Sequence, residues 1–377
     1  MKFWRTIALS ASVGIAAGGS VAAEDYRAAT FTPASENHAR SMQWLADDLK
    51  AVTDGEISFE LFVGGALIPA KSIMQGVADG VAQMGFVFTG YLPSDLPISN
   101  ALTGMAFVET DPIVLALAYA DYIMNDEAGF AEFFDNGVIP VGGIGSAPSD
   151  FLCNTAPITS LDELKGKRIR VPGGLVSQLV QDLGAIPVAI PSSEMYQALQ
   201  GGQVDCVANS PSHLNIDGSL QEVSKSVLRM NMSPAFASPT VVYDADFWQG
   251  LTPENRRVLL DAGAGQLARL EVGYLSPIGD SLRMAEDKGI VVIDPDQTIE
   301  DAVAAWVANG VGGMAANARD TLGIEDPDAL FATFSEYLDK WRPIVAGLND
   351  RLDEEELTAL IKTNLMDKID VTTFGMN

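Results

Sequence analysis

The sequence is poor in the residues from which many enzyme centres are built. It contains only two histidines, His38 and His213, and two cysteines in 377 residues. The histidines lie far apart, without cysteine or aspartate at a metal-ligand spacing, which argues against a zinc site. No Gly-x-Ser-x-Gly, P-loop or Gly-x-Gly-x-x-Gly pattern occurs. The sequence therefore predicts no metal, no cofactor and no histidine-assisted nucleophile.

Positive charge is also scarce. There are 23 lysines and arginines against 50 aspartates and glutamates, which gives a formal net charge of −27. So acidic a protein is a poor partner for nucleic acid or for an anionic membrane surface. If it binds an anion, the site must be a local concentration of positive charge. An apolar content of 47% is ample for one or two hydrophobic cores.

Long apolar runs are missing except at the N-terminus. Residues 1–5 are basic, residues 6–21 are apolar and rich in small side chains, and Val21-Ala22-Ala23 is typical of a cleavage site. We therefore expect a signal peptide, residues 1–23, that is cleaved after Ala23 on export. A retained anchor is the alternative, but the glycine and serine content makes this run a poor membrane span.

Hydrophobic patterning predicts two similar βαβαβ units. The first has strands at 26–31, 57–63 and 80–88 with helices at 38–53 and 71–79. The second has a strand ending near Arg170 and strands at 186–190 and 204–209, with helices at 175–183 and 192–199. In both units a helix leads through glycine into a buried strand. We expect an α/β fold of two lobes, each with a doubly wound sheet.

The connections between the lobes are predicted next. Strands at 139–144 and 151–154 carry the chain to the second lobe and a strand at 238–243 returns it, which would form a hinge. A helical pattern from Thr252 to Lys288 is predicted to span both lobes, with a kink near Pro277 or Gly279. Expected divisions are 24–149 with 241–290 for lobe one, 150–240 for lobe two, and 291–377 for helices that pack across both.

Arg170 is the strongest candidate for a binding residue. It ends a predicted strand, next to Gly173-Gly174 and the start of a helix. Ligands of open α/β sheets bind outside the carboxyl ends of the strands. A planar guanidinium there could hold a carboxylate through two parallel hydrogen bonds. The alternative is a surface arginine that is solvated or salt-bridged.

Both cysteines, Cys153 and Cys206, fall in predicted strands of the second lobe. An exported protein with two cysteines can join them in a disulfide. Two buried free thiols are the alternative.

Several segments in combination resemble the periplasmic substrate-binding component of tripartite ATP-independent periplasmic (TRAP) transporters, of the C4-dicarboxylate-binding type. The sequence has Leu-Lys-Gly-x-x-x-Arg ending at Arg170, then Glu-x-Tyr-x-Ala-Leu and Gly-x-Val-Asp. Gly-Gly-x-Leu follows the strand at 57–63, and Asp246-Phe247-Trp248 precedes Leu251. The resemblance covers the whole mature chain.

The resemblance implies a periplasmic-binding-protein fold of type II kind, with a small organic acid enclosed at the hinge and its carboxylate held by Arg170. It also implies a periplasmic, non-enzymatic protein that delivers its ligand to TRAP membrane subunits, with a monomer as the default state. Motif matching places six further residues at the site, of which Phe151 would stack on the apolar side of the ligand: Gly173, Ser192, Asn209, Phe88, Tyr91 and Phe151.

The sequence departs from the family in two places. Some members have a basic residue near the start of the crossing strand, where this chain has Ser149-Asp150-Phe151, so a second carboxylate has no predicted partner. Cys206 replaces a common glycine, which favours the bridge to Cys153. Two other functions stay open: an exported enzyme that acts on an organic acid through paired carboxylates, and the binding component of an ABC importer or a sensor.

Overall fold

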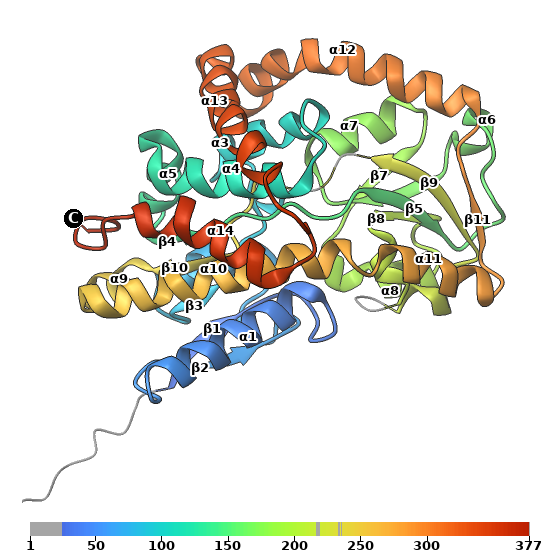
Figure 1. Ribbon diagram of the computed structural model, residues 1–377. Helices are drawn as coiled ribbons and strands as arrows, with labels where there is room; N and C mark the ends of the chain where they lie inside the picture. The colour runs from blue at the N-terminus through green and yellow to red at the C-terminus, as the bar shows by residue number, and fades with distance from the viewer. Residues whose placement is uncertain (1–24, 216–218, 233, 235, 377) are drawn as a thin grey trace, which may run out of the picture.

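The computed structural model describes residues 25–215, 219–232, 234, 236–376, and these form two lobes, each built on its own sheet (Figure 1). The predicted signal peptide and its cleavage site lie outside the described residues. No helix in the described ranges is long and apolar enough to cross a membrane.

The first lobe contains a five-stranded sheet in the order β2-β1-β3-β10-β4. Its strands are β1 (Asp25–Ala29), β2 (Ser58–Phe62), β3 (Met84–Gly85), β4 (Val138–Val141) and β10 (Val241–Asp244). The first three strands are parallel and are joined by α1 (Asn37–Val52) and α2 (Ile73–Ala78), which confirms the predicted βαβαβ unit. Strand β10 is antiparallel to both of its neighbours.

The second lobe contains a six-stranded sheet in the order β11-β9-β5-β8-β6-β7. Its strands are β5 (Ser149–Cys153), β6 (Arg168–Val171), β7 (Ile186–Ala189), β8 (Cys206–Asn209), β9 (Ser226–Met232) and β11 (Val291–Ile293). Strands β6, β7 and β8 are parallel and are joined by α7 (Gly174–Asp182) and α8 (Met195–Gln200), as predicted. Strand β5 is antiparallel to β8 and β9.

Two crossing segments connect a strand of one sheet directly to a strand of the other. One runs from β4 to β5 and the other from β9 to β10, so each sheet includes an antiparallel strand directly connected to the other sheet. The segments lie side by side, because Gly145 bridges Phe236 and the Ile144 N–H donates to the Ser238 carbonyl over 2.9 Å. The predicted antiparallel crossing is therefore present.

The predicted long helix is two helices, α10 (Pro253–Leu275) and α11 (Ile278–Asp287), which are separated at Ser276 and Pro277. Helix α10 packs on α1 in the first lobe, whereas α11 contacts β11 of the second sheet (Figure 1). Strand β11 pairs with β9, so the region after residue 290 supplies a strand to the second lobe as well as helices. The predicted domain boundaries stay predictions.

Three C-terminal helices complete the molecule: α12 (Gln297–Leu322), α13 (Pro327–Val345) and α14 (Glu354–Asn364). Helix α12 contacts α3 (Pro97–Leu102) of the first lobe and α6 (Leu161–Leu164) and α7 of the second, and it runs along one edge of the molecule (Figure 1). Helices α13 and α14 pack on α4 (Pro112–Asn125) and α10. The remaining α-helices are α5 (Glu127–Phe134) and α9 (Ala245–Gly250).

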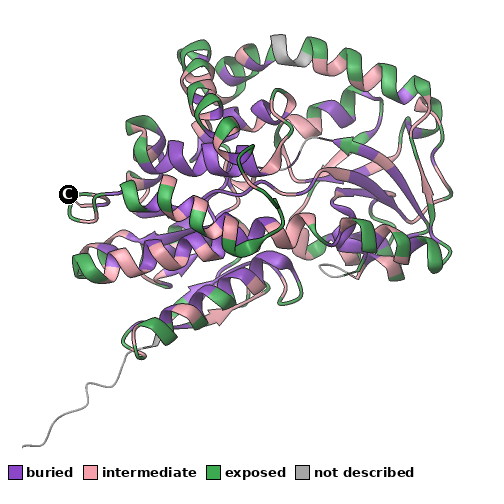
Figure 2. Cartoon of the chain, viewed as in Figure 1, coloured by how far each residue is buried: buried purple, intermediate pink, exposed green. Residues whose placement is uncertain are grey.

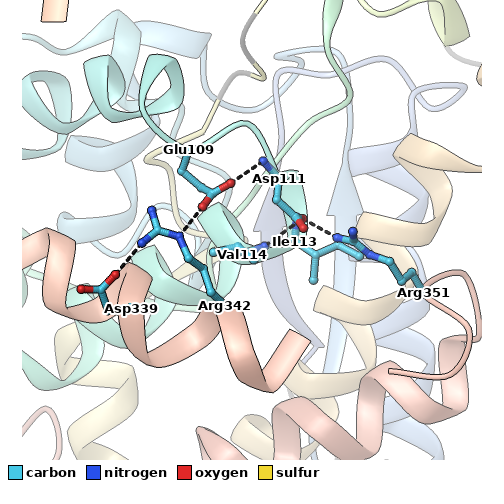
Figure 3. Close-up of polar contacts among 7 residues, drawn as sticks. All are labelled: Glu109, Asp111, Ile113, Val114, Asp339, Arg342 and Arg351. Atoms are coloured by element: carbon cyan, nitrogen blue, oxygen red, sulfur yellow. Dashed lines mark hydrogen bonds and ion pairs between the residues drawn. The ribbon is translucent and has the colours of Figure 1, made fainter. Parts of the chain in front are cut away.

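Polar contacts fix the C-terminal helices to the start of α4 (Figure 3). The Asp111 carboxylate caps α4 by accepting the N–H groups of Ile113 and Val114, and Arg351 forms an ion pair with the same carboxylate. Arg342 of α13 donates from Nε to Glu109 over 2.7 Å.

Each lobe has its own hydrophobic core. The core of the first lobe lies under α1, α4, α10 and α13 and contains Trp248 and Trp341. The second sheet is covered on both faces, with Phe151 and Leu179 on one and Met195 and Leu199 on the other. Figure 2 shows the buried residues concentrated in the sheets and on the inner faces of the helices.

Candidate functional site

A cavity of about 90 Å³ lies between the two lobes. At roughly 10–15 Å³ for one water-sized group, it holds on the order of six to nine such groups, the size of a small organic acid. Both lobes and the crossing segments line it: Phe31, Thr32, Glu36, Asn37, His38, Phe86, Phe88, Tyr91, Ile144, Ser146, Ser149, Arg170, Pro172, Ser192, Ala208, Asn209, His213 and Tyr274.

Arg170 reaches this cavity from β6 of the second lobe. Its neighbours Ile169 and Val171 are fully buried, and Arg170 itself is only 3% exposed. Its Nε donates to the Ile190 carbonyl over 2.8 Å, and its Nη2 donates to the Tyr91 hydroxyl oxygen over 3.3 Å. The alternative of a solvated surface arginine is therefore wrong.

The charge of Arg170 is only partly compensated by the described residues. Burial lowers the pKa of this guanidinium, whereas the nearby Tyr91 and Glu36 raise it. A guanidinium has five N–H donors, of which two are hydrogen-bonded to described residues, and Arg170 forms no ion pair within the described ranges. A buried cation is costly unless it is paired. The geometry therefore favours an anion in the cavity.

Tyr91 connects the lobes at this point. It belongs to the short 3-10 helix η2 (Thr89–Tyr91), which follows β3 of the first lobe. Its hydroxyl oxygen accepts hydrogen bonds from Arg170 and, over 3.1 Å, from the backbone N–H of Ser192, both in the second lobe. Burial raises the pKa of this tyrosine, so its hydroxyl is neutral and is free to accept these bonds without a charge.

The structure brings five of the seven predicted ligand-binding residues to the cavity: Arg170, Asn209, Tyr91, Phe88 and Ser192. Gly173 lies just outside and lines two adjoining hollows. Its φ of 119° favours glycine, and a Cβ there would also crowd the Gly90 carbonyl at 3.1 Å.

Phe151 is not brought to the cavity, which corrects the prediction. It is fully buried in the core of the second lobe and does not line any described hollow. Of the residues of β5, only the first, Ser149, lines the cavity. Phe151 is two residues further along β5. At about 3.3 Å per residue, this places its side chain away from the end of the strand that borders the cavity and within the hydrophobic core.

The two cysteines form a disulfide between β5 and β8, where they face each other in the strand register. This excludes the alternative of two free thiols. The bridge lies within the second sheet, and neither cysteine lines the cavity.

The cavity also contains residues that the sequence analysis missed, in the turn between β1 and α1. Glu36 lies there, and His38, the second residue of α1, is stacked on Phe86 with ring centroids 3.4 Å apart. Burial lowers the pKa of His38 to about 3, so its imidazole is neutral. Glu36 occupies the N-cap of α1, a position at which serine, threonine, aspartate and asparagine are usual, and this was a usable signal.

The sequence can be matched to known families. The family model of the bacterial extracellular solute-binding proteins, family 7, matches residues 28–294, well over half of the chain. The chain belongs to this family. The predicted family resemblance is thus confirmed.

Curated relatives of this family 7 chain are distant. It is 26% identical over 220 residues to the C4-dicarboxylate-binding periplasmic protein DctP of Rhodobacter capsulatus, covering 56% of this chain and 62% of that protein. It is 27% identical over 182 residues to the uncharacterized protein YiiZ of Salmonella typhimurium, covering 47% and 54%. These two matches span only about half to two thirds of each relative.

Solved structures support the two-lobed fold. A Bordetella pertussis extracytoplasmic solute receptor, DctP6, superimposes with a TM-score of 0.71 at 18% identity, over 83% of this chain and 99% of that one. A TRAP periplasmic solute-binding protein from Desulfovibrio salexigens does so with a TM-score of 0.67 at 24% identity, over 85% and 97%. The predicted fold class is thus confirmed for this family 7 chain.

Proposed function

We propose that this chain is a periplasmic solute-binding protein that captures a small organic acid between its lobes through Arg170 and delivers it to TRAP membrane subunits. The observation that carries the proposal is a buried guanidinium in the interlobe cavity, which forms no ion pair with a carboxylate among the described residues.

Known proteins of the same fold support this ligand class. The DctP6 structure contains pyroglutamic acid, one from Desulfovibrio salexigens contains orotic acid, and one from Xanthobacter autotrophicus contains β-D-galacturonate. All three ligands are small acids with one carboxyl group.

The exported-enzyme alternative has less support. Glycoside-type or acid–base chemistry with paired carboxylates needs two acidic side chains at the reacting bond. Among the described residues that line the cavity, Glu36 is the one carboxylate. The lining therefore fits binding better than paired-carboxylate catalysis.

The test compares substitutions at two positions of one strand, Arg170 and Arg168. A thermal-shift screen with pyroglutamate, orotate, galacturonate and succinate first finds the acid that binds, since a ligand at ~100 times its dissociation constant adds about 2.7 kcal/mol of stability. Calorimetry then compares Arg170→Ala and Arg170→Lys with the parent. Arg170→Ala is expected to weaken binding by more than 100-fold, because losing one partner of a buried charge pair costs roughly 3 to 5 kcal/mol.

Arg168→Ala is the matched control. Arg168 lies two residues earlier on β6, its side chain is 42% exposed, and it already pairs with Asp205 over 2.7 Å. Its removal should leave affinity unchanged. The proposal fails if Arg170→Ala, folded by circular dichroism, binds within a few-fold of the parent. Delivery is tested separately by co-purification with TRAP membrane subunits, and it is rejected if the ligand-loaded protein does not associate with them.

A further inference from the structure

Arg170 is not the only charged side chain in the cavity. Glu36 lines the same space from the first lobe and is only 7% exposed. Although it stands at the N-cap of α1, its side chain does not cap that helix. Glu36 thus lines the cavity without making the hydrogen bond that is usual for a side chain at this position.

We infer that the cavity takes a small carboxylic acid whose other end carries an N–H group, an ammonium or an amide, and that Glu36 selects for this group. The inference rests on the proposed function, because it assumes that Arg170 holds the carboxylate. It identifies Glu36 as a specificity-determining residue and places a dicarboxylate outside the preferred ligand class.

The charges of the cavity lining balance. Among the described lining residues, Arg170 is the one arginine or lysine and Glu36 the one carboxylate, and the histidines are His38, which is neutral, and His213. With histidines counted as neutral, the lining has a net formal charge of zero before it binds a ligand. A zwitterion leaves this balance unchanged and a lactam acid adds one negative charge, whereas a dicarboxylate adds two negative charges with one arginine to compensate them.

Aromatic side chains surround the space between Arg170 and Glu36. Phe31, Phe86 and Phe88 line the cavity, so charges inside it are weakly screened. The charge of Glu36 already acts on Arg170 and Tyr91, since it raises the pKa of both. A second ligand carboxylate would meet the same negative charge, whereas an N–H group would donate a hydrogen bond to it.

The test compares small acids that carry an ammonium, a lactam N–H, a methyl group or a second carboxylate besides the first carboxylate. Calorimetry at pH 8 compares 4-aminobutyrate, butyrate and succinate, with pyroglutamate as the acid with a lactam N–H and with amino acids and dicarboxylates of three to six carbons to cover chain length. The parent is compared with Glu36→Gln. Glu194→Gln is the control, because Glu194 lies two residues after Ser192, is exposed and does not line the cavity.

We expect at least one N–H acid to bind the parent at least tenfold more tightly than the dicarboxylate of matching length. Glu36→Gln should lower this ratio at least tenfold, and Glu194→Gln should leave it unchanged. Tighter binding of 4-aminobutyrate than of pyroglutamate would identify the ammonium, and the reverse order the amide.

Two results overturn the inference alone: a parent that binds succinate or another dicarboxylate as tightly as every N–H acid, or a Glu36→Gln variant with an unchanged ratio. In both, a loss of affinity in Arg170→Ala would leave the proposed function intact. If no acid of this panel or of the thermal-shift screen binds, the proposed function fails, and the inference fails with it.

Discussion

Arg168 and Arg170 are two residues apart on one strand, yet their surroundings differ. Arg168, at the start of β6, is partly exposed and bound to Asp205, whereas Arg170 is buried at the cavity. The sequence motif ending at Arg170 predicted which of the two faces a ligand. Hydrophobic periodicity alone could not, because residues two apart lie on the same face of a strand.

Tyr91→Phe tests how much the contact between the lobes contributes to affinity. The variant keeps the ring but removes the oxygen that accepts hydrogen bonds from Arg170 and Ser192. Each such bond is worth about 0.5 to 1.5 kcal/mol. Loss of both bonds should therefore lower affinity for the organic acid by roughly 5- to 150-fold in calorimetry.

Tyr196→Phe is the control for this substitution. Tyr196 donates its hydroxyl to Glu222 on the surface of the second lobe and lines no described hollow. It should bind like the parent. Equal affinity in both variants would mean that the bonds of the Tyr91 hydroxyl to the second lobe do not contribute to affinity.

The site could be predicted only in part from the sequence. Arg170, Ser192 and Asn209 end or follow parallel strands, where ligands of such sheets bind, so the strand pattern and the family motifs agreed on them. Phe151 was predicted to line the site and does not, whereas Glu36 lines it and was not predicted. The depth of Phe151 depends on where β5 begins, and the position of Glu36 depends on how the other lobe closes over the second sheet.

At the scale of elements, the sequence predicted those with a strong period and missed those without one. Both βαβαβ units were found, but β9 was not, although it pairs with β5 and leads into the second crossing. Its apolar residues are two methionines, one leucine and a single β-branched valine, and Arg229 and Asn231 interrupt the apolar pattern. Strand β3 is also shorter than predicted, at two residues.

Asp111→Ala tests the attachment of the C-terminal helices to α4. This carboxylate caps two N–H groups of α4 and pairs with Arg351 (Figure 3). Loss of an N-cap costs about 0.5 to 2 kcal/mol and loss of an exposed ion pair about 0 to 1 kcal/mol. Urea unfolding should show a destabilisation of about 1 to 2 kcal/mol for this variant.

Arg351→Ala separates the two contributions, since it removes the ion pair and leaves the cap. We expect it to lower the free energy of unfolding by less than about 1 kcal/mol. If both variants lose the same stability, the cap contributes nothing and the ion pair is the important contact.

At the scale of the whole molecule, stability should depend on the protonation of Glu132. This carboxylate lies on α5 and accepts hydrogen bonds from the Ile98 and Ser99 backbone N–H groups and from the Ser99 hydroxyl. Burial raises its pKa from 4.5 to about 7, against the effect of those bonds. The folded state therefore binds a proton more tightly than the unfolded state does.

The sign of the pH dependence follows. The stabilising contribution of protonated Glu132 to the free energy of unfolding is fully present below the unfolded pKa. It is lost as pH rises towards 7, by up to about 3 kcal/mol. Relative to Glu132→Gln, the parent should become less stable by about 2 to 3 kcal/mol between pH 5 and pH 7 in urea unfolding. The opposite contribution of His38, whose pKa is lowered, is common to both proteins and cancels. A difference that does not change with pH would contradict the prediction.

The two crossing segments also determine the order in which the molecule can be assembled. Strand β10 lies between β3 and β4, and β4 pairs with no other described strand. The first sheet therefore stays in two separate pieces until residues 241–244 have left the ribosome, by which time all but one strand of the second sheet has been synthesised. The nascent chain therefore cannot complete its first sheet until most of its second sheet has also been synthesised.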